Sequence, residues 1–328
     1  MNVGTIGYEV HSGLGHLVRD YYQHGIVTRL LPIRHSHYKN YPGKWIAPCD
    51  RYINPHEFIR DLDVLLLFET GFNWGAIRRA KDRGVKVVVI PNYEYTPFPL
   101  PVKPDLMLCG SLLDVDYYKE QYPTKFLNVP VDTERFPWCE RTVANVFIHN
   151  AGHGQRGFAK GTPQILDAME YVQSDVKVIV RGQPGERRIR ELFSAHHDPR
   201  VELRLDEFSE QDLYSEGDVF INAEQFNGLS LPLQEAYASG MPVVTTDRYP
   251  ANTWLPKSIL LPVDHVVQDR EAVQFTRSMV TPQAIAVQID ALYGRDISRY
   301  SQTGKEWAEN HSWRVVGPQI IEVLECLL

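Results

Sequence analysis

Short apolar runs of strand length, separated by helical patterns, recur along the chain, and this alternation constrains the fold more than any other feature. The first set of runs comprises Val3–Tyr8, Val64–Phe68, Val85–Ile90 and Leu106–Cys109, with a helix expected over Trp74–Arg83. Continuous apolar runs are typical of parallel strands that are buried on both faces. Because such strands need covering helices, the pattern predicts an α/β domain.

The same pattern restarts near Val143. The second set comprises Val146–Ile148, Val176–Val180, Val201–Leu205, Asp218–Asn222 and Met241–Thr245. A Gly-rich turn over 152–161 leads into a helix expected over Thr162–Tyr171. A chain of 328 residues is long enough for two cores. We therefore predict a first domain at 1–140 and a second at 141–304. A C-terminal helix at 305–328, with a kink or break at Pro318, is expected to pack back on the first domain.

Charge and composition narrow the class of protein. The net charge is −7, and the acidic excess falls in residues 141–328, since residues 1–140 hold 16 basic and 16 acidic side chains. No run approaches the roughly 18 apolar residues of a membrane span, and the N-terminus lacks the pattern of a secretory signal. The four cysteines form no Cys-x-x-Cys pair. These observations predict a cytoplasmic protein without a structural zinc site.

The segment from Asp218 to Thr246 is the most informative for function, because it reads as strand, loop, helix, strand. A loop that enters a helix directs free N–H groups and the positive helix end to one point, where a pyrophosphate binds well. We expect the amides of Gly228, Leu229, Ser230 and Leu231 to bind it. Glu235 lies about one turn into the helix, where its carboxylate is placed to accept both hydroxyls of a ribose.

Residues Gly228–Val244 resemble the donor-binding signature of the retaining GT-B glycosyltransferases of family 4, the glycosyl transferases group 1. Asn128–Phe136 resembles the hinge motif of that family, and Ser312-Trp313 resembles the pair before its last helix. The resemblance implies an α/β fold of GT-B type, with two Rossmann-like domains facing each other across a cleft. It also implies transfer of a sugar from a UDP- or GDP-sugar to an acceptor hydroxyl, with retention of configuration.

Asn227 departs from the family pattern, because the first acid of the signature falls on this position. The family uses that acid to hold hydroxyls of the transferred sugar. An Asn side chain can still donate and accept hydrogen bonds, so the change affects the identity of the sugar more than the donor site. Glu224, three residues earlier, is an alternative source of the missing carboxylate.

Arg156 and Lys160 resemble the basic pair that the family places opposite the donor phosphates. Negative charge grows on the diphosphate as the glycosidic bond breaks, and fixed cations stabilise it. The resemblance therefore implies a nucleotide sugar as co-substrate and no required metal or other cofactor. The Asp-x-Asp triplets that begin at Asp61 and Asp114 are expected to cap local structure instead of binding a metal.

Other candidate residues follow strands in both halves. Gly13, Gly15 and His16 form a weak Gly-x-Gly signal, which the resemblance interprets as a loop that closes over the donor phosphate and sugar. Glu94 and Glu69 are candidates to orient or deprotonate the acceptor hydroxyl. Each of these carboxylates is equally consistent with an ordinary loop residue. Arg181, Glu207 and Phe208 lie where related enzymes hold the nucleotide base.

For the acceptor, the sequence leaves two classes open. The acid-poor stretch from Arg29 to Tyr52 contains Arg34, Lys39, Lys44, Trp45 and Arg51. Cations bind phosphates and aromatic rings stack on bases, as in phage transferases that modify hydroxymethylated DNA. A solvated loop with a small-molecule or glycan acceptor is the favoured interpretation, with DNA as the alternative. A non-catalytic nucleotide-sugar-binding protein, suggested by Asn227, is a weaker hypothesis. A dehydrogenase is weaker too, because the best phosphate-binding loop lies in the second half.

Overall fold

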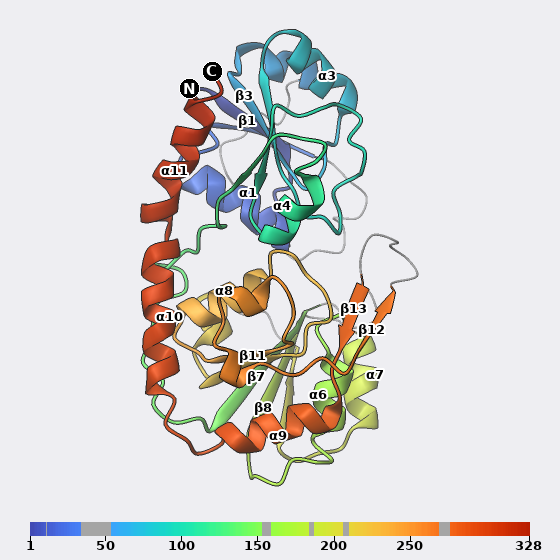
Figure 1. Cartoon of the computed structure of the whole chain (residues 1–328), viewed down its shortest axis with the longest axis vertical. Helices are drawn as coiled ribbons and strands as arrows, with labels where there is room; N and C mark the ends of the chain where they lie inside the picture. The colour runs from blue at the N-terminus through green and yellow to red at the C-terminus, as the bar shows by residue number, and fades with distance from the viewer. Residues whose placement is uncertain (11, 34–53, 153–158, 184–186, 206–209, 269–275) are drawn as a thin grey trace. The chain divides into compact units, whose positions relative to one another are not determined.

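The computed structural model describes the chain except residues 11, 34–53, 153–158, 184–186, 206–209 and 269–275 (Figure 1). It divides into two compact units. The first contains Met1–Pro130 and His311–Leu328, and the second contains Val131–Asn310. The division therefore falls about ten residues before the predicted boundary, and the chain returns to the first unit at His311 instead of Lys305.

The first unit contains a six-stranded parallel sheet of order β2-β1-β3-β4-β5-β6. Its strands are β1 (Val3–Gly7), β2 (Arg29–Pro32), β3 (Val64–Phe68), β4 (Lys86–Ile90), β5 (Leu106–Cys109) and β6 (Thr124–Phe126). Its helices are α1 (Gly13–Gln23), α2 (Pro55–Phe58), α3 (Trp74–Asp82), α4 (Leu112–Tyr118) and α11 (Trp313–Glu325). All five residues of β1 and of β3 are buried, as continuous apolar strands require.

The C-terminal helix α11 packs on the first unit through Trp313. The indole stacks on His24 at 4.3 Å between ring centroids and meets Tyr21 edge to face at 5.1 Å. The preceding helix, α10 (Ser298–His311), ends where Ser312 begins α11. The helix breaks at Ser312, and Pro318, where the sequence predicted a kink or a break, lies inside α11 without a break.

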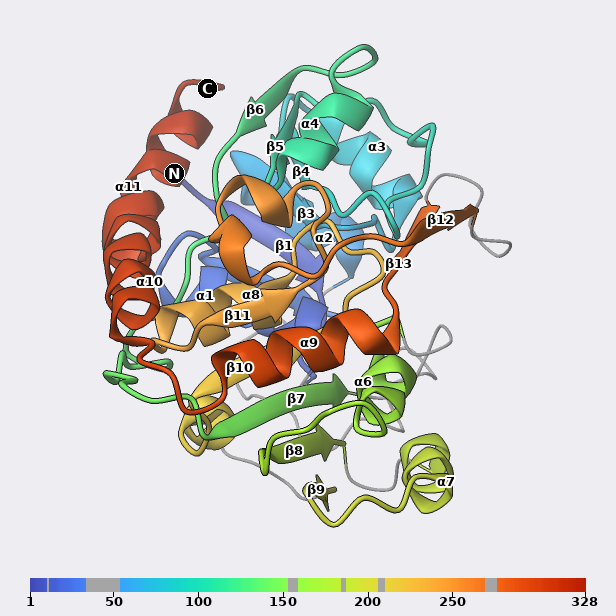
Figure 2. The ribbon, with the colours of Figure 1, turned by 60° about the horizontal axis from the view of Figure 1, so that its bottom comes forward.

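The second unit contains a five-stranded parallel sheet of order β11-β10-β7-β8-β9. Its strands are β7 (Val146–Gly152), β8 (Lys177–Gly182), β9 (Val201–Arg204), β10 (Val219–Asn222) and β11 (Val243–Thr245). The helices are α6 (Thr162–Ala168), α7 (Arg187–Ala195), α8 (Leu231–Ala238), α9 (Pro282–Leu292) and α10. An antiparallel hairpin, β12 (His265–Gln268) and β13 (Thr276–Met279), was not expected from the sequence (Figure 2).

Alternate residues of the second sheet enter two separate cores. Val219 and Ile221 of β10 pack in the cluster that contains Ile165 of α6 and Ile289 of α9. Phe220, between them, packs with Leu233 and Tyr237 of α8. Helices therefore cover both faces of this sheet, which is the doubly wound arrangement predicted from the sequence.

Each sheet has one point where the strand order reverses. In the first sheet β1 lies between β2 and β3, and in the second β7 lies between β8 and β10. In open parallel sheets, ligands bind outside the carboxyl ends of the two strands at such a switch point. The segments after β1 and β3, and those after β7 and β10, are therefore the places to look for function.

Candidate functional site

Lys160 follows the carboxyl end of β7, beside the switch point of the second sheet. A Cβ at Gly152, the last residue of β7, would lie 3.4 Å from the Lys160 ammonium nitrogen. Gly161 has φ of 75°, and a Cβ there would lie 2.4 Å from the carbonyl oxygen of Ala223. The backbone N–H of Gln225 donates to the carbonyl of Ala159 at 2.7 Å. Together these contacts hold the lysine against the segment that follows β10.

The charge of Lys160 is balanced within the second unit. Burial lowers the pKa of its ammonium group, and the carboxylates of Glu224 and Glu235 oppose that lowering. Lys160 and Glu235, which the sequence assigned to phosphate and ribose, therefore lie within electrostatic reach of each other.

His149, in β7, is a buried residue of this region that the sequence did not identify. One ring nitrogen, Nδ1, lies 2.9 Å from the carbonyl of Ile221, and Nε2 lies 2.8 Å from Oγ1 of Thr162. Since a carbonyl only accepts, Nδ1 carries the proton and Nε2 accepts from the threonine hydroxyl. Burial lowers the pKa of His149 to about 4, so the ring is neutral at pH 7. It links β7, β10 and α6 without adding charge.

Asn227 organises the loop that leads into α8. Its Oδ1 accepts from the N–H groups of Leu229 and Ser230 at 3.0 and 2.9 Å, and its Nδ2 donates to Glu224 at 3.0 Å. Two of the four amides predicted to bind a pyrophosphate are therefore already bonded to Asn227. A phosphate reaches them only by exchange with this side chain. The other two, Gly228 and Leu231, lie on the same loop and at the start of α8.

Glu224 is bound on several sides by the protein. Its carboxylate accepts from Ser230 Oγ at 2.6 Å and forms an ion pair with Arg248 at 3.2 Å. Arg248 also donates to the carbonyl of Asn227 at 2.7 Å. Both Glu224 and Arg248 are buried. The carboxylate of Glu224, the suggested substitute for the missing acid, thus stabilises the loop through its bonds to Ser230 and Arg248.

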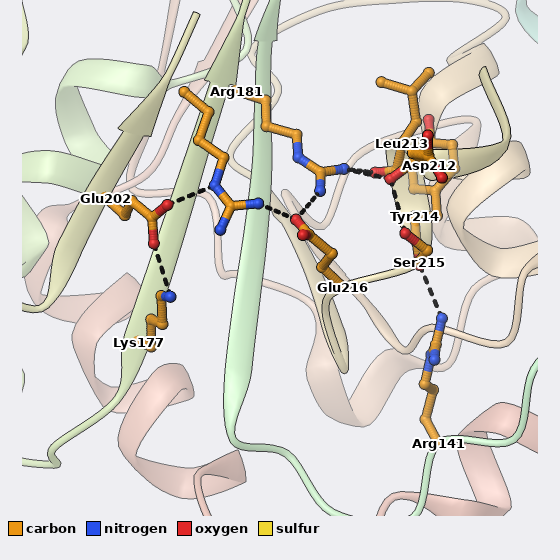
Figure 3. Close-up of polar contacts among 10 residues, drawn as sticks. Arg141, Lys177, Arg181, Glu202, Asp212, Leu213, Tyr214, Ser215 and Glu216 are labelled. Atoms are coloured by element: carbon orange, nitrogen blue, oxygen red, sulfur yellow. Dashed lines mark hydrogen bonds and ion pairs between the residues drawn. The ribbon is translucent and has the colours of Figure 1, made fainter. Parts of the chain in front are cut away.

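Glu235, on α8, is held by Tyr214. The phenol donates to the Glu235 carboxylate at 2.8 Å, and burial followed by the charge of Glu235 raises the pKa of Tyr214. Arg141 donates to the backbone carbonyl of Tyr214 at 2.8 Å (Figure 3). The tyrosine is therefore fixed by its backbone and its hydroxyl at once.

Arg181 supports the same tyrosine from the end of β8. Its guanidinium donates to the carbonyls of Asp212 and Leu213 and to Glu216, which Arg204 also contacts (Figure 3). The side chain is 2% exposed. The structure thus places Arg181 in a buried support for the turn Glu210–Tyr214, and through Tyr214 for Glu235. A direct contact with the nucleotide base remains a prediction.

Gly13, Gly15 and His16 lie in the first turn of α1 and do not form the expected loop. Ser12 caps this helix by accepting from the N–H of Gly15 at 3.1 Å. A Cβ at Gly15 would lie 1.9 Å from the carbonyl oxygen of Val10, so no other residue fits there without a shift of the backbone. The Gly-x-Gly pattern therefore reflects a close helix entry. Contact of these residues with the donor phosphate and sugar remains a prediction.

The acidic candidates of the first unit lie near its switch point. Glu69 directly follows β3 and has φ of 60°, which is unusual for a residue with a side chain. Asn92, on the turn after β4, donates to Glu69 Oε1 at 3.4 Å. Glu94 lies on the same turn and is 6% exposed. Neighbouring strands therefore bring the segments that carry Glu69 and Glu94 to one edge of the sheet.

Several predicted site residues lie outside the described part of the chain. They are Arg156, Glu207 and Phe208 of the donor site and Arg34, Lys39, Lys44, Trp45 and Arg51 of the basic stretch. Among the residues that are described, no group of three or more His, Cys, Asp or Glu is arranged to hold a metal ion. No helix in the same set is long and apolar enough to cross a membrane.

A cavity of about 600 Å³ lies in the first unit between β5, β6 and α11. It is lined by Leu106, Leu127, Val323, Leu327 and five other residues, none of which is a predicted site residue. The volume therefore does not mark the candidate site.

Comparison with known proteins bears on the family of the second unit and on the fold. Residues 147–278 match the family model described as Glycosyl transferases group 1. This range contains Lys160, the Asn227 loop and Glu235, and the match confirms the resemblance found in the sequence. The match covers less than half of the chain, so it identifies a glycosyltransferase-like segment within the second unit. No curated protein sequence matches the chain.

Solved structures resemble the whole chain at low sequence identity. A sucrose-phosphate synthase from Thermosynechococcus elongatus is 14% identical, with a TM-score of 0.69 over 100% of this chain and 99% of its own. Anabaena HepE, solved with UDP-glucose, is 12% identical, with a TM-score of 0.69 over 99% of each chain. The pneumococcal O-GlcNAc transferase GtfA, solved with UDP and GlcNAc, is 16% identical, with a TM-score of 0.60. The aligned region is 83% of this chain but 59% of GtfA. The predicted GT-B fold with two Rossmann-like domains is confirmed.

Proposed function

We propose that this protein transfers a sugar from a nucleotide sugar to a hydroxyl of a glycan or small-molecule acceptor, with retention. The observation that carries the proposal is the placement of Lys160, the Asn227 loop and Glu235 around the switch point of one sheet, inside the segment that matches the family model. UDP is the nucleotide we favour over GDP, because HepE and GtfA were each solved with UDP or a UDP-sugar.

In the proposed reaction, the bond between the anomeric carbon and the diphosphate oxygen breaks, and the acceptor oxygen forms the new bond to that carbon. The electron pair of the broken bond stays on the diphosphate. Lys160, with Arg156, stabilises this growing charge. The acceptor proton passes to the leaving diphosphate or to Glu94 or Glu69. Glu235 binds the ribose hydroxyls, and Tyr214 holds its carboxylate in place.

Asn227 lies where the proposed site would hold the transferred sugar. Both ends of its amide are bonded within the protein. A hydroxyl of the sugar would need to use the remaining hydrogen-bonding capacity of Oδ1 or exchange with a loop amide. The identity of the transferred sugar therefore depends on this loop more than on Glu235.

Two other interpretations receive less support. The DNA-modifying alternative rests on the basic stretch from Arg29 to Tyr52, in which residues 34–52 lie outside the described part of the chain. The names of the three similar structures above contain no nucleic acid. A non-catalytic sugar-nucleotide binder would share the donor site and differ only in turnover.

The proposal is tested with UDP-, GDP-, ADP- and dTDP-sugars. Calorimetry is expected to give binding of a UDP-sugar, and incubation without acceptor is expected to release UDP slowly by hydrolysis. Binding without any release of nucleotide, with acceptors or without them, would favour the non-catalytic interpretation. Absence of binding for every nucleotide sugar would overturn the proposed function.

A further inference from the structure

We propose that Tyr95 and Phe98, on the segment that follows β4, form a stacking platform for a glycan acceptor of at least two sugar rings. The inference rests on the proposed function, because it specifies the acceptor of that reaction. It concerns the described residues of the first unit alone.

Two aromatic rings are exposed close together in the sequence of this segment. The side chains of Tyr95 and Phe98 are 46% and 43% exposed, although the residues around them, Asn92, Tyr93 and Glu94, are buried. Exposure of an aromatic ring to water is unfavourable, and its burial against a ligand is favourable. Two exposed rings on one short segment therefore indicate an interaction surface. The surface is small, which fits a sugar better than a protein partner.

The segment is held rigidly from below. Phe98 meets Tyr117 edge to face at 5.3 Å between centroids, and Tyr117 lies 6.1 Å from Tyr93. The backbone N–H of Tyr93 donates to the buried carboxyl of Asp114 at 3.0 Å, and the N–H of Tyr95 donates to the carbonyl of Asn92 at 2.8 Å. A platform fixed in this way binds without a large cost of ordering.

The turn that carries Tyr95, and Glu69 to which this turn bonds, offer hydrogen-bond acceptors. Glu69 and Glu94 supply carboxylates, and the Oδ1 atom of Asn92 is buried with no hydrogen-bond partner among the described residues. A buried acceptor in this state calls for a donor, from water or a ligand. Asn92 also bonds to Glu69, which directly follows β3 at the switch point. These acceptors therefore favour a ligand that donates hydrogen bonds.

A glycan meets both requirements. Its hydroxyls donate to carboxylates in charge-assisted hydrogen bonds, and the C–H face of each ring packs on an aromatic side chain. A nucleic acid fits less well, because its phosphates would approach the carboxylates of Glu69 and Glu94. One ring at the carboxylates leaves Tyr95 and Phe98 to a second ring, so we expect a disaccharide to bind better than a monosaccharide.

The test compares glucose with maltose, cellobiose and lactose as acceptors for the nucleotide sugar that the protein hydrolyses. Direct binding is followed in parallel by saturation-transfer difference NMR. In the double variant Tyr95→Ala/Phe98→Ala, the KM of the best disaccharide is expected to rise about tenfold or more. The kcat at saturation and the hydrolysis of donor without acceptor should stay within about twofold.

Matched variants separate stacking from folding. Tyr171 of the second unit is 43% exposed, so Tyr171→Ala removes an equally exposed ring and should leave the KM unchanged. Tyr95→Trp should retain disaccharide binding, since it retains a ring. Loss of the Phe98 packing could unfold the segment in the double variant. The single variant Tyr95→Ala keeps that packing, and its melting temperature shows whether it is folded.

Three results would overturn the proposal. The first is an equal effect of the double variant on glucose and on the disaccharide, and the second is a wild-type protein that binds no disaccharide. The third is a wild-type protein that binds oligo(dT) and a double variant that loses this binding but still binds sugar. Failure of the proposed function is a different result, because then no nucleotide sugar would bind or be hydrolysed even by the wild type.

Discussion

The two units carry different chemistry at equivalent places, the carboxyl ends of strands beside a switch point. In the second unit, Asn227 and Glu224 are bonded to each other and to neighbouring groups. In the first unit, Tyr95 and Phe98 expose rings on the same segment as the buried Glu94. A network that holds its own polar groups is preorganised for one fixed ligand. A surface of rings on a loop suits ligands that vary. The contrast supports a nucleotide on the second unit and an acceptor on the first.

Opposite responses to pH give the largest expected difference between the units. Burial raises the pKa of Asp114, in the first unit, to about 7 from 3.8. The folded unit keeps a proton that the unfolded chain loses, so this contribution to stability is present below pH 4 and lost as pH rises through 7. It amounts to as much as about 4 kcal/mol. In the second unit, the folded pKa of His149 is about 4 against 6.5. That contribution is present above pH 6.5 and lost as pH falls through 4, up to about 3 kcal/mol.

Hydrogen exchange of strand amides measures the two responses separately. Between pH 7 and 4, amides of β3 and β4 should become better protected relative to those of β7 and β10, after correction for intrinsic exchange rates. Asp114→Asn should abolish the first response, and His149→Gln the second. Parallel changes in both units, unaffected by either substitution, would show that the two groups do not set the difference.

Replacement of Arg181 tests whether its buried hydrogen bonds hold Tyr214, and through it Glu235, in place. Arg181→Ala removes bonds to two carbonyls and Glu216 and should lower the free energy of unfolding by about 3 kcal/mol. Urea unfolding measures it. The matched control is Arg187→Ala, whose side chain is 88% exposed and pairs with Glu191 four residues on; it should change stability by less than about 0.5 kcal/mol. Similar losses of unfolding free energy in both variants would show that Arg181 does not have a special supporting role.

Removal of the Lys160 charge should act on turnover. Lys160→Ala is expected to reduce kcat about a hundredfold, the scale of one lost electrostatic stabiliser, with a smaller effect on donor binding. Initial rates at saturating donor measure this. Lys81→Ala, in the first unit, removes a lysine paired with Asp105 and should leave kcat unchanged. Weaker donor binding with a normal kcat would show that Lys160 contributes to binding of the donor and not to turnover.

The fold was largely predictable, because the buried strands are continuous apolar runs. Val64–Phe68 and Leu106–Cys109 are strands with the predicted bounds. The strands that were missed, β2, β6 and the β12–β13 hairpin, are short or lie at edges, and His265–Gln268 is exposed throughout. Such strands lack the apolar run because the core does not require one.

The residues proposed for the donor site could be selected from the sequence, but the hydrogen bonds among them could not. The loop, Lys160 and Glu235 were found from a motif, since their spacing along the chain is local. The roles of Tyr214, Arg248 and His149 depend on contacts between residues up to 72 positions apart. Arg181 was assigned to the ligand because it follows a strand. No local signal indicated that its side chain also binds the carbonyls of Asp212 and Leu213.

Calorimetry of UDP with two matched carboxylate variants tests the central claim, that the second unit binds the nucleotide through Glu235. Charged hydrogen bonds are worth about 1.5 to 3 kcal/mol each, so Glu235→Gln should weaken UDP binding at least tenfold. Glu94→Gln, in the first unit, should leave UDP affinity unchanged and affect only the acceptor. Unchanged affinity in Glu235→Gln, or an equal loss in Glu94→Gln, would contradict the assignment of donor and acceptor to different units.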